Sequence, residues 1–458
     1  MDQDIDPRHI IDVAIVGGGP SGLGTAYGLR EVDARVRVFE RSADVGGRTE
    51  TIRLDGLPIN VGALFVYVGT RTEQMCAELG IDWLPVEPET LGIHYAGKTV
   101  ISTDSEELAT SLPLSSQARD DFVRVIRQMR AAYSTYGGKD MIGSEELASL
   151  TLAEFLGPLD PEVVAIVEAA VIAAVVGRPD ELSAQYGLRY FASFLVHDQA
   201  SRGLITDGMQ EICRSIHRRL PDDVVELETS VESVELVGGG NWRLQLRRRD
   251  ELKHCIARRV VMAVPGPHVA DIVPSLPAWK VDAIARVSTP SALSLAVVVD
   301  CTDRPAWEDI FVIFSVGTMF QAITQPQCGT AFLPHAANKT YFMLYRHHDP
   351  VDTIRGYDTE TLTNQFLEDF YTVLPEARGR VLGTYLRRWE ACFAYPGKDR
   401  QSALTDVRAE VGTMYFAGDY TSASAGIHGA LTEADRVSAA LRADLLSDGR
   451  SPASADGG

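Results

Sequence analysis

The chain has 458 residues, 45% of them hydrophobic and 23% charged, which is enough apolar material for the core of a soluble globular protein. The formal net charge is −20 and no run of lysine or arginine occurs, which argues against nucleic acid and an anionic membrane surface as partners. The six cysteines are sparse and form no CxxC pair, which predicts a reducing, cytoplasmic location with neither a disulfide framework nor a metal site.

The ends of the chain and its apolar runs predict no targeting or membrane segment. The first residues, MDQDIDPRHI, are acidic and polar, unlike a signal peptide. The nearest candidate for a membrane span, residues 163–177, is interrupted by Glu168 and is shorter than the roughly 18 residues needed, so we expect a buried helix there. The small polar residues 447–458 predict a disordered tail.

Residues 11–40 predict a strand, a glycine-rich turn, a helix and a second strand. The turn, in VAIVGGGPSGLGTA, carries Gly17, Gly19 and Gly22 in the GxGxxG spacing, which permits a tight turn, close approach of a pyrophosphate and close packing of helix on strand. Glu40 ends the second strand, where an acid accepts the hydroxyls of a ribose. The stretch therefore predicts a dinucleotide site, although nicotinamide and flavin enzymes share it.

The rest of the chain alternates between strand-rich and helical segments. We expect short strands over 51–68, helices over about 105–200 and 207–220, a small β-meander over 224–249, a strand at 258–265, mixed strand-rich structure over 292–345, a helix over 363–374, a strand at 414–420 and a long helix over 429–446. Nucleotide-type elements occur at the start, in the middle and at the end of the chain. We therefore predict an α/β fold with a Rossmann-type cofactor domain in three segments, 1–92, 205–288 and 386–446, and an inserted mixed α+β substrate domain, 93–204 and 289–385.

The residues after Glu40, RSADVGGRTE, favour a flavin over a nicotinamide dinucleotide. A second glycine pair, Gly46 and Gly47, lets a loop pass along the pyrophosphate, and Arg48 offers a forked donor to a phosphate. Further on, INVGALFVY supplies the small residues Gly62 and Ala63 where backbone can approach a ring.

Four blocks carry a family resemblance that spans nearly the whole chain: VAIVGGGPSGLGTA with VFERSADVGGRTE; TDGMQEICRSI with ETSVESVEL and VVMAVP; RRWEACFAYPG; and YFAGDYTSASAGIHGALTEADRVSAA. In these blocks the chain resembles the flavin-containing amine oxidases, a family that includes protoporphyrinogen oxidases and relatives of phytoene desaturase. The resemblance implies that FAD is the cofactor. It also implies that the backbone of Val231 holds the adenine, that Trp389 lines the flavin, and that a helix opening near Gly429 and Ala430 points at the pyrimidine end of the ring.

Motif and resemblance together predict a non-covalent FAD site formed by Gly17, Gly19, Pro20, Ser21, Gly22, Glu40, Arg41, Gly47, Arg48, Gly62, Ala63, Leu64, Val231, Trp389, Gly418, Asp419 and Ile427. Some monoamine oxidases tether the flavin through a cysteine in this region, and Cys392 can be aligned with it. The alternative is that Cys392 is a buried thiol.

The chain departs from the family at two places. Many members carry a lysine that bonds to the flavin through water, and the aligned position here is Ser294. Monoamine oxidases frame the substrate with two tyrosines; Phe393 or Tyr395 matches one of them, and Ile427 falls near the other. We predict Tyr395, Phe393 and Trp389 as residues that line the substrate and the flavin.

Other side chains leave alternatives open. His428 is a candidate base or a structural histidine, and His197 and Tyr186 are candidates for the substrate cavity or for ordinary core and surface positions. Tyr67 and Phe65 either line the flavin ring or pack in the core.

The resemblance implies an oxidase that takes a hydride from the carbon next to the nitrogen of an amine or amide-like substrate. The product is an imine, and oxygen re-oxidises the flavin to give hydrogen peroxide. The two departures favour a specialised substrate, as in a tailoring step of secondary metabolism. The alternatives are a C–C desaturase of the protoporphyrinogen oxidase or phytoene desaturase type, and a binding module that keeps the FAD fold. Many relatives are dimers, so a homodimer is expected.

Overall fold

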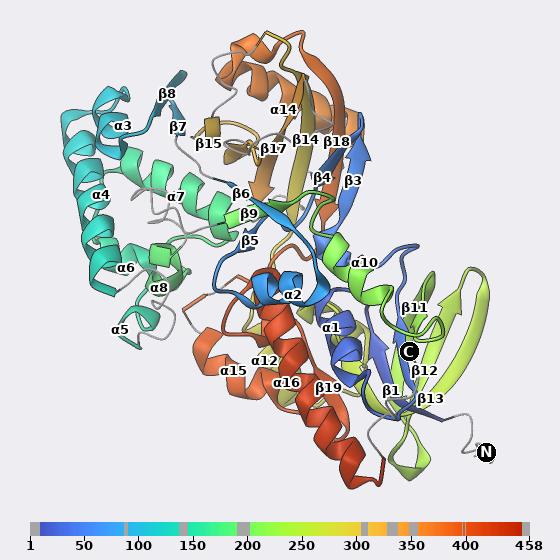
Figure 1. Cartoon of the computed structure of the whole chain (residues 1–458). Coiled ribbons are helices and arrows are strands. Elements are labelled where there is room, and N and C mark those ends of the chain that lie inside the picture. Colours follow the sequence, from blue (N-terminus) through green and yellow to red (C-terminus); the bar gives the residue numbers. More distant parts are fainter. Residues whose placement is uncertain are drawn as a thin grey trace.

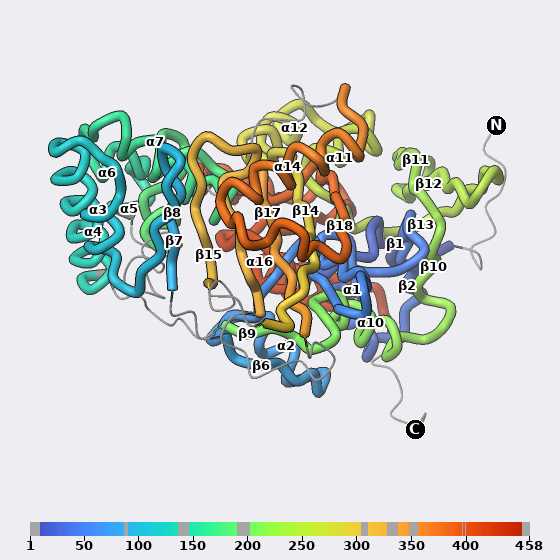
Figure 2. Tube along the Cα trace, turned by 90° about the horizontal axis from the view of Figure 1, so that it is seen from above, coloured from blue at the N-terminus to red at the C-terminus, as the bar shows by residue number. Residues whose placement is uncertain are grey.

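Two seven-stranded sheets form the framework of the computed structural model (Figure 1). The structure describes residues 10–86, 90–136, 145–189, 202–303, 310–327, 338–347, 356–395, 397–398 and 400–450. Seen from above, the helices α3 to α7, one sheet and then the other follow one another along the molecule (Figure 2).

The first sheet is assembled from three distant parts of the chain. Its parallel strands lie in the order β10 (Val225–Glu226), β2 (Val36–Phe39), β1 (Ile11–Val16), β13 (Glu251–Met262) and β19 (Met414–Phe416). The second half of β13 lies between β1 and β19, and its first half continues into an antiparallel meander with β12 (Trp242–Arg248) and β11 (Thr229–Leu236). This is the predicted Rossmann-type arrangement with its meander.

Helices cover this sheet. On one side α1 (Pro20–Leu29) packs along α16 (Gly426–Ser447), beside α2 (Arg71–Leu79) and α10 (Glu211–His217). Gly24 and Gly28 make the close approach of the first pair possible, because a Cβ at Gly28 would lie 2.4 Å from the hydroxyl oxygen of Ser438. On the other side lie α11 (Gly266–Ile272), α12 (Ala278–Ala285) and α15 (Arg400–Arg408).

The second sheet has the order β18 (Val381–Trp389), β14 (Ala292–Asp300), β17 (Lys339–His347), β16 (Ala322–Thr324), β15 (Ile310–Ser315), β7 (Thr90–Tyr95) and β8 (Lys98–Ser102). Only the pair β15 and β7 is parallel among these strands. The hairpin β7–β8 joins this sheet from a part of the chain far from its other strands.

The strand β14, which lies between β18 and β17, is buried along both faces, and this explains why Ser294 is the only polar residue before its end at Asp300. Its odd-numbered residues, such as Leu295 and Val297, pack with the helix α14 (Thr359–Val373). Its even-numbered residues, such as Ala296, face the hairpin of β3 (Thr51–Leu54) and β4 (Leu57–Asn60). Ser294 belongs to this second face.

The helical part of the chain lies beside β7, β8 and β15 (Figures 1 and 2). It comprises α3 (Ser105–Ser111), α4 (Ser116–Tyr136), α5 (Glu145–Ala148), α6 (Leu152–Leu156), α7 (Pro161–Val175) and α8 (Ala184–Gly187). The helix α7 is the expected buried one: Asp160 caps it, Pro161 starts it, and Glu168 reaches Arg178 at 3.0 Å. No helix within the described ranges is long and apolar enough to cross a membrane.

A small sheet of β5 (Val66–Tyr67), β9 (Arg202–Ile205) and β6 (Trp83–Val86) connects the two halves of the molecule. Several strands cross the predicted domain boundaries: β7 spans residue 92, β9 spans residue 204, and β18 spans residue 385 while pairing with β14 of the second sheet. Strand pairing cannot be read from local sequence patterns. The boundaries predicted from the sequence can therefore fall within a strand. The predicted tail begins at Ser447, the last residue of α16, and residues 451–458 lie outside the described ranges.

Candidate active site

A cavity of about 1150 Å³ lies where the two sheets meet. Every residue of the predicted FAD site lines it except Gly22 and Gly418. Of the predicted substrate-lining residues, Trp389 and Phe393 line it as well. Tyr395 does not belong to this lining, and its hydroxyl donates to Glu181 at 2.6 Å instead. The prediction for Tyr395 is therefore not supported, because its side chain packs toward the helical part, against Gly177.

The glycine turn between β1 and α1 fits a pyrophosphate. Gly17 has φ +107°, and a Cβ there would lie 2.8 Å from the carbonyl oxygen of Ala263. A Cβ at Gly22 would lie 1.9 Å from the carbonyl oxygen of Gly17. Gly19 caps α1, and the nearest atom to a Cβ there is 4.0 Å away, so the backbone at the helix N-terminus is open to the cavity.

Glu40 is held at the cavity edge by backbone donors. Its Oε2 accepts from the N–H of Gly18 at 2.7 Å and its Oε1 accepts from the N–H of Ser42 at 2.8 Å. Both the residue type and its place at the end of β2 fit the ribose of a dinucleotide.

Arg48 and Asp419 form a bidentate ion pair across the cavity wall. Nη1 of Arg48 donates to one carboxylate oxygen at 3.0 Å and Nη2 to the other at 2.7 Å. Asp419 also accepts from the N–H of Ala394 at 3.0 Å, and Arg48 donates to the carbonyl of Cys392 at 3.2 Å. The sequence predicted that the guanidinium of Arg48 binds a phosphate, but in the structure it binds the carboxylate of Asp419.

The ion pair controls the protonation of its carboxylate. Burial alone would raise the pKa of Asp419, but the Arg48 charge and the hydrogen bonds outweigh burial and hold this pKa below its usual value. The folded protein therefore keeps this carboxylate ionised at neutral pH. Its contribution to stability is complete above about pH 4 and is lost as the pH falls through the lowered pKa.

The carbonyl oxygen of Val61 holds two side chains of the cavity lining in place. It accepts from Nε1 of Trp389 at 3.1 Å and from the hydroxyl of Ser294 at 3.0 Å. Ser294 is buried, lines the cavity and thus lies at the wall where the aligned lysine of the family was expected to act. Its hydroxyl is used to hold the loop that contains Gly62.

The substrate-side wall is the part of the lining that comes from α7, β5, β9 and the strands β15, β16 and β17 of the second sheet, together with residues adjoining them. It consists of Phe65, Tyr67, Ala173, Ala174, Val176, Arg202, Phe311, Val312, Phe314, Ala322, Thr324, Tyr345 and His347. Tyr67 and Phe65 thus belong to the cavity and also pack against the core of the helical part. Tyr186 is buried in that core, and His197 lies outside the described residues.

Arg202, Tyr345 and His347 were missed by the sequence analysis. Each lies in an apolar strand that contains no recognisable motif. Only the pairing of β5, β9 and β17 with neighbouring strands brings the three residues to one cavity. The one usable signal was a charged residue at the start of an otherwise apolar strand, RGLI.

His347 and His428, two of the histidines that line the cavity, are neutral at physiological pH. Burial lowers the pKa of His347 to about 4, against the opposing effect of hydrogen bonds to the backbone of Ile172 and Ala173. Burial, then the charges of Arg189 and Arg400, lower the pKa of His428 to about 4. Nε2 of His428 has no hydrogen-bond partner among the described residues. The structure therefore gives no evidence that this nitrogen has a structural role.

Cys392 lines the cavity with a protonated thiol. Burial raises its pKa to about 12, the Arg48 charge lowers it, and Asp419 raises it. Since the thiolate is the nucleophilic form, this environment does not favour attack on a flavin.

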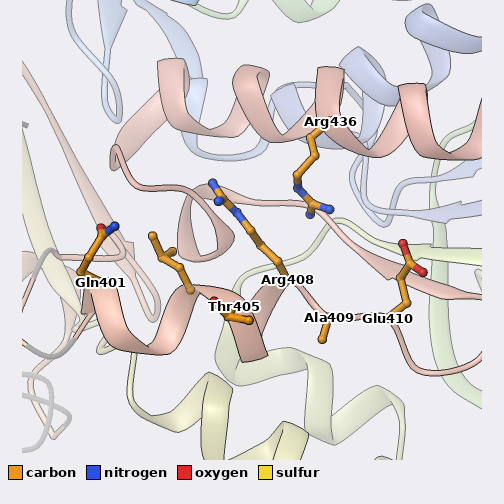
Figure 3. A pocket seen from close by; sticks show the side chains of 7 residues that line it. Gln401, Thr405, Arg408, Ala409, Glu410 and Arg436 are labelled. Carbon is orange, nitrogen blue, oxygen red and sulfur yellow. The ribbon is translucent and has the colours of Figure 1, made fainter. Parts of the chain in front are cut away.

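A smaller hollow of about 540 Å³ lies between α15 and α16 (Figure 3). Arg408 and Arg436 point into it, and both are bonded to the buried carboxylate of Glu433, at 2.6 and 2.7 Å. Their charges are thus engaged within the protein, and we assign no site to this hollow.

The family is shown by comparison with known proteins. The sequence model of the flavin containing amine oxidoreductases matches residues 20–442, so the chain belongs to this family of FAD-dependent oxidoreductases.

Individual relatives share little sequence identity with this chain, and their names describe different oxidases. The chain is similar to a probable flavin-containing monoamine oxidase A of Dictyostelium discoideum, at 21% identity over 93% of each chain. It is similar to an L-amino-acid oxidase of Bungarus fasciatus, at 22% identity over 93% of this chain and 84% of that protein. Its fold matches that of wild-type putrescine oxidase bound to putrescine, with a TM-score of 0.72 at 20% identity over 94% of this chain and 99% of the other.

Replacing Asp419 by Asn should destabilise the protein and weaken FAD binding, because Arg48 then lies in the cavity wall without its carboxylate. Breaking such a pair costs about 3–5 kcal/mol. Urea unfolding of D419N, followed by tryptophan fluorescence, measures this loss. The control is Glu368→Gln, which breaks the exposed pair with Arg378 and should change the free energy of unfolding far less. Equal losses for the two variants would contradict the role given to the Arg48–Asp419 pair.

FAD should separate from the protein when the holoenzyme is precipitated with acid, because the protonated Cys392 thiol is a poor nucleophile. The measurement is the yellow absorbance of the supernatant against that of the pellet. Flavin that stays in the wild-type pellet and is released from Cys392→Ala would establish a covalent link instead.

Proposed function

We propose that this enzyme oxidises the carbon next to the nitrogen of an amine or amide-like substrate to give an imine. Bound FAD supplies the hydride acceptor, and the net reaction is R₂CH–NH₂ + O₂ → R₂C=NH + H₂O₂. The observation that carries the proposal is the single cavity in which the FAD-fitting residues and the substrate-side wall meet.

The protein's own residues act mainly by binding and by excluding water. The rings of Phe65, Phe311 and Phe314 give the wall an apolar surface against which a C–H bond can be held. Trp389 also lines the cavity and is held by the hydrogen bond from its indole N–H to the Val61 carbonyl. Because His347 and His428 are neutral and desolvated, neither supplies a charge to the reaction at neutral pH.

The same wall supports an amine substrate over the C–C desaturase alternative. It contains a buried arginine, a tyrosine hydroxyl and a histidine, and such groups are costly to leave against a purely hydrocarbon substrate.

Ser294 at the lysine position and the incomplete aromatic frame support a specialised substrate, and we propose a tailoring reaction of secondary metabolism. Ile427 lines the cavity where the second tyrosine of the frame was sought. The five cysteines in the described ranges are free, which supports a cytoplasmic location. The homodimer expected from the family resemblance stays a prediction.

Anaerobic mixing of the yellow holoenzyme with amines, amides, amino acids and polycyclic alkenes tests the reaction type. We expect bleaching of the flavin absorbance only by compounds that carry a C–H next to nitrogen. Bleaching only by compounds without nitrogen at the reacting carbon would place the enzyme among the desaturases. A flavin that no donor reduces would point to a binding module.

The rate of flavin reduction should rise with pH through the pKa of the substrate ammonium, because the neutral amine is the hydride donor. It should show no inflection near 6.5, the usual histidine pKa, that depends on His347 or His428, because both of these side chains are already neutral there. His428→Asn should keep the shape of this profile. An inflection near 6.5 that disappears in H428N would instead make His428 a base.

A further inference from the structure

The hydroxyl of Tyr345 is a buried polar group without a hydrogen-bond partner among the described residues. The side chain belongs to β17, lines the cavity and is 8% exposed. Leaving such a donor unsatisfied is costly, and native proteins keep few groups of this kind. Since this one borders a ligand cavity, a bound ligand is the natural acceptor for it.

The register of the second sheet places Tyr345 beside residues that were predicted to line the flavin. Tyr345 is directly opposite Ser294 of β14, and opposed side chains lie on one face of a sheet, about 5 Å apart. The Ser294 hydroxyl and the Trp389 indole both bond to the Val61 carbonyl, just before Gly62. Tyr345 also packs in the same apolar cluster as Trp389 and Val61. The ring of Tyr345 is therefore a neighbour of this loop.

Small residues flank Tyr345 on both sides. Ser294 in β14 and Ala322 in β16 are its directly opposed partners, and both line the cavity as well. Because their side chains are short, the tyrosine ring extends further from the sheet than either of them. Its hydroxyl can thus reach a ligand that passes over this part of the sheet.

The surroundings of the hydroxyl keep it protonated. Burial, and then the neighbouring Tyr341, Cys392 and Tyr67, raise the pKa of Tyr345 well above its usual value. Cys392 and Tyr67 line the cavity too, so the hydroxyl lies among cavity residues. At neutral pH it is an uncharged donor.

We propose that the Tyr345 hydroxyl donates a hydrogen bond to the ring of bound FAD. The ring offers carbonyl oxygens and ring nitrogens as acceptors. Hydride transfer from a neutral amine leaves an iminium cation and adds one negative charge to the ring: R₂CH–NH₂ + FAD → R₂C=NH₂⁺ + FADH⁻. A hydrogen bond to a charged acceptor is stronger than one to a neutral acceptor, so Tyr345 favours the reduced cofactor. The proposal concerns the cofactor and is independent of which substrate reduces it.

The reduction potential of bound FAD tests this role in the holoenzyme. Tyr345→Phe removes the hydroxyl and keeps the ring, so the packing of β17 is retained. We expect the midpoint potential of Y345F, measured against a reference dye during slow reduction with dithionite, to become more negative. The expected change is about tenfold in the reduction equilibrium, which is about 30 mV for a two-electron couple. The visible absorption band of the oxidised flavin should shift as well.

Tyr341→Phe is the matched control. Tyr341 lies four residues earlier in β17, hence on the same face, and is 2% exposed. It is not among the described residues that line the cavity, and its hydroxyl is hydrogen-bonded to the backbone of Asn60. We expect Y341F to leave the potential and the spectrum of bound FAD as they are in the wild type.

The stability of the apoprotein gives a second signature, which a merely structural role would not produce. Without FAD the Tyr345 hydroxyl lacks its acceptor, so Y345F should leave the midpoint of urea unfolding unchanged or raise it. Y341F should lower that midpoint, because it breaks a hydrogen bond. Added FAD should raise the midpoint of Y345F by less than that of the wild type, since the variant binds the cofactor more weakly.

Each remaining outcome would overturn the proposal. An unchanged potential and spectrum in Y345F would show that the hydroxyl does not bond to the ring. An equal change in Y341F would attribute the effect to the packing of β17. An unchanged potential with weaker binding of a reducing amine would assign the hydroxyl to the substrate. Failure of every amine to bleach the flavin would refute the proposed function alone, because dithionite reduces FAD without a substrate.

Discussion

The ion pair between Arg48 and the buried carboxylate of Asp419 is the interaction on which the site depends. It joins two segments that are 371 residues apart in the chain, the glycine loop after β2 and the loop that leads into α16. Through Ala394 and Cys392 it also fixes the segment after β18, so three stretches of the cavity lining meet at one carboxylate. Because the charges neutralise each other inside the protein, the wall can approach a dinucleotide without an unpaired charge. The three-segment cofactor domain needs such a connection, since β1, β13 and β19 come from distant parts of the chain.

The alternation of side chains along β14 is a second constraint on the cavity. The strand β14 presents alternate side chains to α14 and to the cavity, so Ser294 faces inward only because the period of a strand is two. Its hydroxyl and the Trp389 indole both bond to Val61, which fixes the backbone just before Gly62. A Cβ at Gly62 would lie 2.0 Å from the carbonyl oxygen of Arg48, so this loop must also run close to the glycine loop. The substrate side and the cofactor side of the cavity are thereby positioned by the same few contacts.

The cofactor half of this arrangement was predictable because local motifs encode it. The glycine turn, Glu40 and the loop of Arg48 are each specified by residue type and spacing, and the structure places them on one cavity. The Rossmann-type fold and the meander follow from periodicity. The substrate-side wall was not predictable in the same way: Arg202 and Tyr345 reach one cavity through strand pairings between distant segments, which no local pattern records. Tyr395 illustrates the converse, because a residue adjacent in sequence to Phe393 and Cys392 turns away and bonds to Glu181. The Arg48 fork was expected at a phosphate, since its acidic partner lies at the far end of the chain.

In the reaction that we propose, a hydride leaves the carbon next to nitrogen and reduces the flavin in this cavity. We would measure anaerobic stopped-flow reduction of the holoenzyme by the amine that bleaches its flavin fastest, carrying hydrogen or deuterium at the carbon next to nitrogen. We expect deuterium at this single position to slow the bleaching of the flavin and to leave substrate binding unchanged. Equal rates for the two isotopes, in a step shown to be flavin reduction itself, would contradict transfer from that carbon.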